Sequence, residues 1–130
     1  MTTKKLPPAF AELEEYLAWA LPTETQRLQK RETSTLPEIR AFYDAVLPHA
    51  DAIMEHFRCV DRAAAAGTAV PAETRHLFTL MLAFSDASLS VELHRSPTVP
   101  DGMHWDLWKP EHETSGWQQK PSIRLFPAAA

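Results

Sequence analysis

The segment from Pro71 to Arg95, PAETRHLFTLMLAFSDASLSVELHR, is the longest strongly apolar stretch of the chain and restricts the fold more than any other. At about 100° per residue its apolar side chains fall on two nearly opposite stripes. One stripe contains Leu77, Leu80, Met81, Phe84, Ala87, Ser88 and Val91, and the other contains Phe78, Leu82, Leu89 and Leu93. A helix that is apolar on most sides is buried among its neighbours, so this segment is predicted to be the central core helix.

The ends of this segment also favour a helix. Pro71 suits a first helical turn, and Arg95 suits the negative end of the helix dipole. Pro97 prevents the helix from continuing. Charged residues interrupt the apolar run, so the segment is not expected to span a membrane; they are Glu73, Arg75, Asp86 and Glu92.

The chain has only three glycines in 130 residues, and β-branched residues are sparse within the periodic segments, which argues against a β-sheet protein. We therefore predict one all-α domain over residues 1–130, an antiparallel bundle of about four helices. The expected helices cover residues 8–21, 23–33, 35–60 and 71–95. Residues 1–7 are expected to be a disordered lead, the helix at 23–33 to face solvent, and residues 96–130 to form an irregular tail rich in aromatic residues and proline.

The segment from 35 to 60 carries the most regular helical pattern. Thr35 is a predicted N-cap, with Glu38 three residues later. Apolar residues then recur in alternating steps of three and four, as in a heptad seam: Leu36, Ile39, Tyr43, Val46, Ala50, Ile53, Phe57 and Val60. Pro48 lies inside this seam and is predicted to kink or divide the helix.

Charge and cysteine content limit the possible partners and compartments. The net charge of −4 disfavours nucleic acid and anionic membrane, and the patch of Arg27, Lys30 and Arg31 is diluted by neighbouring glutamates. Cys59 is the only cysteine, which fits a reducing compartment, and the N-terminus has no apolar signal region. A cytoplasmic protein is expected.

Asp86 is the most unusual residue of the central segment, because it lies among apolar residues. Burial would raise its pKa, and it could then contact a ligand or act as a general acid or base. Ser90 and His94 continue the same strip at four-residue steps, and His76 lies beside it. The alternative is that this strip is the solvent-facing or close-packed side of the helix. A ligand site formed by Asp86, Ser90, His76 and His94 is therefore a hypothesis beside that structural interpretation.

No catalytic, cofactor or metal motif is complete. Glu73 and His76 have the Glu-x-x-His spacing of di-iron helical bundles, but a second such pair is missing. His49 and His56 are about 10 Å apart along a helix, too far to share an ion by themselves. No catalytic residue, metal ligand or cofactor is assigned, and the protein is expected not to be an enzyme.

The tail contains candidate anchor residues for a partner. Trp105, Leu107 and Trp108 could dock on the helices of their own chain, or form an arm that binds a second copy or another protein.

Two functional classes follow from these patterns. The first is a small non-enzymatic accessory or protein-interaction protein, acting as a homodimer or as a subunit of a larger assembly. The second is a binder of an apolar small molecule, or a cofactor-free enzyme, with a pocket between helices around Asp86. A metal-binding bundle is a third, minor class.

Overall fold

The computed structural model describes residues 3–107, and within them every regular element is helical. The prediction of an all-α fold is therefore confirmed. In chain order the elements are η1 (Pro8–Trp19), α1 (Glu24–Thr33), α2 (Leu36–Val46), η2 (Leu47–His49), α3 (Ala50–Ala65), α4 (Ala72–Ser88) and η3 (Leu89–His94).

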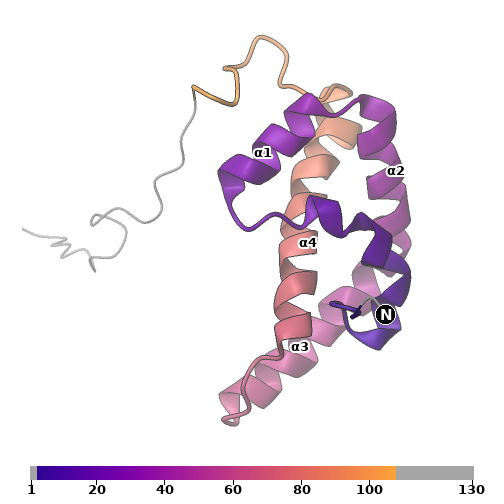
Figure 1. Ribbon diagram of the computed structural model, residues 1–130, viewed down its shortest axis with the longest axis vertical. Helices are drawn as coiled ribbons and strands as arrows, with labels where there is room; N and C mark the ends of the chain where they lie inside the picture. The colour runs from indigo at the N-terminus through magenta and orange to yellow at the C-terminus, as the bar shows by residue number, and fades with distance from the viewer. Residues whose placement is uncertain (1–2, 108–130) are drawn as a thin grey trace, which may run out of the picture.

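The helix α4, continued by η3, runs almost the full length of the molecule (Figure 1). α2 packs along its upper half, and α1 and η1 pack against it as well. α3 continues downward from α2 and forms the lower end of the molecule together with the first turns of α4 (Figure 1). The segment predicted to be central is thus the element around which the others are arranged.

Side-chain caps set the starts of α1 and α2. The hydroxyl of Thr23 accepts a hydrogen bond from the backbone N–H of Gln26, whose side chain accepts one from the backbone N–H of Thr23. The hydroxyl of Thr35 accepts from the backbone N–H of Glu38 at 3.3 Å. Each cap satisfies an N–H group that has no partner inside its helix.

The seam from 36 to 60 is divided at Pro48, where the three-residue 3₁₀ turn η2 separates α2 from α3. Proline lacks the N–H needed for an α-helical hydrogen bond, so a tighter turn at this point is physically reasonable. α2 buries Ile39, Phe42, Tyr43 and Val46, whereas α3 buries only Ile53. The two halves of one sequence pattern therefore have very different surroundings.

The core lies where α2, α4 and η1 meet, and α3 and η3 each add one buried apolar residue. Aromatic rings fill much of it: Trp19 stacks on Phe42 with 4.8 Å between ring centroids, and Tyr43 stacks on Phe84 at 5.3 Å. The buried apolar residues are Leu6, Phe10, Leu13, Ile39, Phe42, Tyr43, Val46, Ile53, Leu77, Leu80, Ala83, Ala87 and Val91.

The second apolar stripe of α4 departs from the prediction. Of its large side chains, Phe78 is 53% exposed and Leu93 is 68% exposed, and Leu89 is also exposed. The strip of small residues is instead close-packed, since Ala83 and Ser90 are buried. Small side chains let neighbouring helices approach closely, so α4 is covered on this side as well as along the stripe that contains the buried Leu77 and Leu80.

The N-terminal segment is more ordered than the sequence suggested. The expectation of a disordered lead is wrong for Leu6, which is buried and whose backbone N–H donates to the carboxylate of Glu14 at 2.7 Å. η1 is a 3₁₀ helix rather than the expected α-helix, and Phe10 has non-helical backbone angles within it. Phe10 is buried, so this irregular turn directs an aromatic ring into the core.

Candidate functional site

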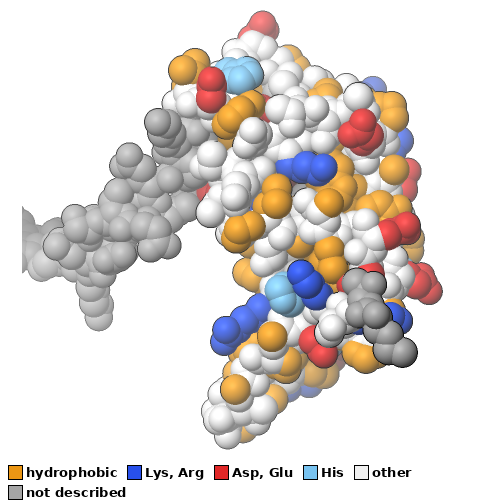
Figure 2. Space-filling model, viewed as in Figure 1, with side chains coloured by type: hydrophobic (Ala, Val, Ile, Leu, Met, Phe, Trp, Pro, Cys, Tyr) orange, Lys and Arg blue, Asp and Glu red, His pale blue; other side chains and the backbone are white. Residues whose placement is uncertain are grey.

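The apolar face of α3 is only partly covered by the other described residues, 3–107. α3 is strongly amphipathic, yet only Ile53 is buried. Met54 is 47% exposed, and Phe57 and Val60 are half-buried. Figure 2 shows exposed hydrophobic side chains at the projecting lower end of the molecule, where Figure 1 places α3. A large apolar face without cover is typical of an interaction site.

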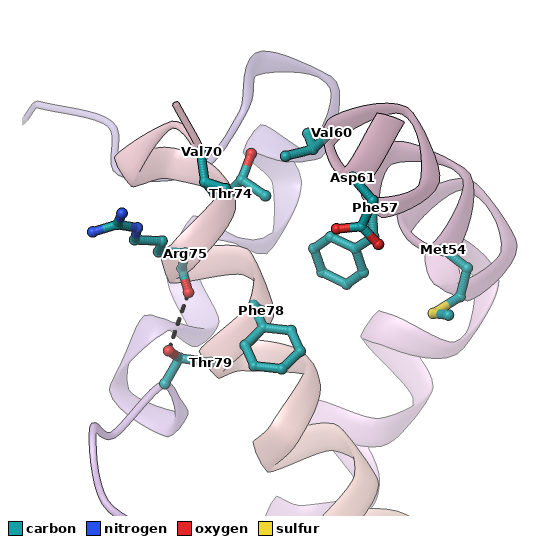
Figure 3. Close-up of a pocket in the computed structure, with 9 residues that line it drawn as sticks. All are labelled: Met54, Phe57, Val60, Asp61, Val70, Thr74, Arg75, Phe78 and Thr79. Atoms are coloured by element: carbon teal, nitrogen blue, oxygen red, sulfur yellow. Dashed lines mark hydrogen bonds between the residues drawn. The ribbon is translucent and has the colours of Figure 1, made fainter. Parts of the chain in front are cut away.

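A cavity of about 460 Å³ lies between α3 and α4. Figure 3 shows Met54, Phe57 and Val60 on the α3 side and Thr74 and Phe78 on the α4 side. Its lining residues are Met54, Phe57, Val60, Asp61, Val70, Thr74, Arg75, Phe78 and Thr79. We call these nine residues the hairpin surface.

Two contacts hold α3 and α4 together at this cavity. The Nε2 of His56 is 2.9 Å from the hydroxyl of the buried Thr74, and Phe57 meets Phe78 edge to face at 5.9 Å between centroids. The connecting loop turns at Gly67, whose φ of +98° favours glycine. These contacts join the two walls of the hairpin surface.

Opposite charges stand on the two walls of the hairpin surface. Asp61 belongs to α3 and Arg75 to α4 (Figure 3). Both side chains belong to exposed residues. The hairpin surface therefore combines an apolar centre with one acidic and one basic side, which a partner can match.

Asp86, the first predicted site residue, lies in a charged contact between α4 and α1. Its Oδ2 is 3.9 Å from the Nε of Arg27, and its backbone carbonyl accepts a hydrogen bond from Nη1 of Arg31 at 3.3 Å. Burial raises the pKa of Asp86 above its ordinary value, while the charges of Arg31 and Arg27 oppose that rise. Both arginines are largely buried, so Asp86 serves as their counter-charge.

The other predicted ligand residues are not gathered around Asp86. Ser90 is fully buried and its hydroxyl donates to the carbonyl of Pro97 at 3.4 Å, beside the turn at Arg95 that has a φ of +53°. His76 is exposed and His94 is half-buried. None of these four residues lines the cavity between α3 and α4.

The candidate tail anchors are placed only in part. Trp105 is half-buried beside His104, and Leu107 is 69% exposed. Trp108 lies outside the described residues. Val99, Gly102 and Met103 lie against α1, where they border a cavity with Arg31 and Glu32.

The described residues contain neither a metal-binding cluster nor a membrane-spanning helix. Within residues 3–107, no three His, Cys, Asp or Glu side chains converge to hold a metal ion. In that part of the chain no helix combines the length and apolar character needed to cross a bilayer. Cys59 is exposed, with its Sγ 3.8 Å from a carboxylate oxygen of Glu55.

Sequence reasoning missed the burial of the α1 arginines. The expectation that α1 faces solvent is wrong for Arg31, which is 4% exposed, and Arg27 is also largely buried. Lys30, the third member of the patch, lies over the Trp19 ring at 4.9 Å. The sequence feature that could have predicted this burial is the strip of small residues on α4, including Ala83 and Ser90, because small side chains leave room for a polar helix to pack closely.

No protein-family model, curated protein or solved structure matches this chain.

Proposed function

We propose that this chain is a small, non-enzymatic protein-interaction protein of the cytoplasm that acts as a homodimer through the hairpin surface. The observation that carries the proposal is the exposure of large apolar side chains on both walls of an ordered cavity, above all Phe78 and Met54. Burial of apolar area is the main driving force for association, so a second apolar surface placed here lowers the free energy.

A second copy of the same chain is the occupant that the charges favour. In a two-fold dimer, residue i of one copy meets residue j of the other, and residue j of the first meets residue i of the second. Asp61 on α3 and Arg75 on α4 can then form two equivalent ion pairs across the interface. The apolar centres of the two hairpins meet between them, which completes a four-helix arrangement of two α3–α4 hairpins.

The first test replaces an exposed apolar residue of the hairpin surface. We expect the wild-type protein to be a dimer by native mass spectrometry and analytical ultracentrifugation, and Phe78→Asp to be a monomer with unchanged helical circular dichroism. A charge placed in the centre of an interface is desolvated without a partner, which strongly disfavours association. Since Phe78 is 53% exposed in one copy, the fold of the monomer should tolerate this change.

A matched control lies on the same helix. Leu93 is 68% exposed near the opposite end of the α4–η3 helix, and Leu93→Asp should leave the dimer intact. Leu107→Asp tests the tail in the same way. If Leu107→Asp dissociates the dimer and Phe78→Asp does not, the interface belongs to the tail and the hairpin proposal is wrong.

A charge exchange tests the two-fold geometry directly. Asp61→Arg and Arg75→Asp should each weaken the dimer by placing like charges opposite each other, and the double variant should restore it. Exposed ion pairs contribute only about 0–1 kcal/mol each, so the expected change in dissociation constant is several-fold. Failure of the double variant to recover affinity would contradict the pairing.

A second candidate function is favoured by the size of the cavity. Its volume of about 460 Å³ lies within the range of small-molecule sites, and its walls are mostly apolar. An apolar ligand held there, rather than around Asp86, would raise the melting temperature of the monomeric protein. A thermal-shift screen of apolar acids and aromatic compounds tests this alternative, and a screen without any shift argues against it.

A further inference from the structure

The cavity between α3 and α4 has a chemical feature beyond its apolar walls, which is a pair of aromatic rings. Phe57 and Phe78 meet at 5.9 Å between ring centroids, with 75° between the ring planes. Phe78 is 53% exposed and Phe57 is half-buried, so both rings keep accessible surface. Two rings at nearly a right angle form a corner, and one cation placed in that corner can lie against both rings.

Asp61 adds an acidic group to this aromatic corner. It follows Phe57 by one turn of α3, and both residues line the cavity (Figure 3). Asp61 is exposed, and within residues 3–107 its carboxylate makes no ion pair or hydrogen bond. A carboxylate and the faces of aromatic rings both attract positive charge. The corner therefore favours a cationic group over an anionic or a neutral one.

The other polar groups of the cavity are occupied or directed elsewhere. Nε2 of His56 lies 2.9 Å from the hydroxyl of Thr74, and the hydroxyl of Thr79 donates to the carbonyl of Arg75 at 3.1 Å. The guanidinium group of Arg75 points away from both aromatic rings, whereas the Asp61 carboxylate lies on the side of the Phe57 ring (Figure 3). Asp61 is therefore the charged residue of the cavity that faces the aromatic corner.

The small number of acceptors in the cavity selects the type of cation. A primary ammonium group has three N–H donors, and each needs an acceptor when water is excluded. Asp61 supplies the carboxylate of this cavity, and both threonine hydroxyls already have partners. A quaternary ammonium group has no N–H donor and is attracted to aromatic faces, so it leaves no donor unpaired. Met54, Val60 and Val70 provide apolar walls for a chain attached to it.

We infer that the cavity between α3 and α4 binds a quaternary ammonium compound with a short apolar chain. Phe57 and Phe78 contact the methyl groups of the cation, and Asp61 balances its charge. The chain lies against Met54 and Val70. The volume of about 460 Å³ accommodates a ligand of this size. The inference rests on the second candidate function, a ligand in this cavity, and it adds the charge of that ligand.

The test compares two probes of the same shape in ¹⁵N NMR titrations of the full chain. (4-Hydroxybutyl)trimethylammonium carries the charge, and 5,5-dimethylhexan-1-ol has carbon in place of the nitrogen. Saturable shifts are expected at the backbone amides of Phe57, Asp61 and Phe78, and the cation should bind at least about threefold more tightly than the alcohol. A merely apolar cavity prefers the neutral probe. Absence of saturable shifts, or equal or tighter binding of the alcohol, overturns the inference, and so does tighter binding of the primary amine 4-aminobutan-1-ol.

Two variants and a matched control assign the effect to these residues. Asp61→Asn keeps the shape of the side chain and removes its charge, so it should weaken binding of the cation about threefold and leave binding of the alcohol unchanged. Phe78→Leu keeps an apolar side chain without the ring, and should weaken binding of the cation about two- to fivefold with a smaller effect on the alcohol. Asp51→Asn changes an exposed residue of the same helix outside the cavity and should alter neither. Equal losses for both probes would contradict the inference.

Dimer formation is measured apart from this ligand. Titrations in dilute protein, where the chain is monomeric, report binding without a second copy over the cavity, and sedimentation without a probe reports the dimer. Binding in the absence of a dimer overturns only the homodimer proposal, and a dimer without binding overturns only this inference. Where both occur, the cation should raise the dissociation constant of the dimer, because both use the same surface.

Discussion

α2 and α3 carry one continuous apolar seam, yet most of the seam is buried in α2 and only Ile53 is buried in α3. Ile39, Phe42 and Val46 are fully buried in α2, whereas Phe57 and Val60 on α3 remain half-exposed. The difference arises at Pro48, after which the chain follows α4 less closely and forms the projecting end of the molecule. An amphipathic pattern therefore shows that a helix needs an apolar neighbour, but it does not show whether that neighbour belongs to the same chain.

The largest effect is expected when a buried aromatic residue of α2 is replaced and compared with the same replacement on α3. Phe42→Ala should lower the free energy of unfolding by about 3–5 kcal/mol, because it removes a fully buried ring stacked on Trp19. Phe57→Ala should cost about 1 kcal/mol at low protein concentration, where the chain is monomeric. Urea denaturation monitored by circular dichroism measures both.

The comparison becomes sharper when protein concentration is varied. If α3 is covered in a dimer, the stability lost in Phe57→Ala should grow with concentration, because dimer formation stabilises the folded state by mass action. The loss in Phe42→Ala relative to wild type should change much less. An equal cost at the two positions in dilute protein would show that α3 is packed as well as α2.

A smaller effect is expected at the turn that joins α3 to α4. Gly67→Ala should destabilise the protein by roughly 1–2 kcal/mol, because alanine is strained at a φ of +98° while the space around its Cβ is empty. Gly67→Asn should cost less, since asparagine tolerates positive φ better. Hydrogen exchange should become faster in α3 before it changes in α2, and uniform acceleration would contradict a locally stable hairpin.

The smallest predicted effect concerns the charged contact between α1 and α4 in the well-packed half. Burial raises the folded-state pKa of Asp86 above 3.8, so the folded state binds this proton more tightly than the unfolded state. The contribution of Asp86 to stability should therefore fall as pH rises from its ordinary pKa through its raised pKa. Relative to wild type, Asp86→Asn should gain stability over that interval and then level off.

Denaturation of wild type and Asp86→Asn at a series of pH values between about 3 and 7 measures this difference. A relative stability of Asp86→Asn that falls with rising pH would mean that attraction to Arg27 and Arg31 outweighs the cost of burial. The sign of the slope thus distinguishes the two physical causes.

The local features of the fold were predictable because they depend on nearby residues. The caps at Thr23 and Thr35 and the break at Pro48 each follow from hydrogen bonds or steric limits within a few residues. The position of the central helix followed from an apolar run that only a core could bury.

The burial of Arg31 and the exposure of Phe78 were beyond such local reasoning. Arg31 belongs to a polar helix in sequence, and its burial depends on the close approach of α1 to Asp86, 55 residues away. Phe78 belongs to an apolar stripe, and its exposure depends on α3 diverging from α4. Both outcomes are set by which faces meet when the helices pack, and that choice involves the whole chain.

The sequence by itself therefore determined the helical class, the helix boundaries at caps and prolines, and the apolar faces in need of partners. Only the tertiary structure decided which of those faces found a partner: within residues 3–107 it buried Arg31 of α1 and left the apolar face of the α3–α4 hairpin partly exposed. The physical reason is that hydrogen bonds and backbone sterics act locally, whereas burial is shared among elements that the chain brings together from a distance.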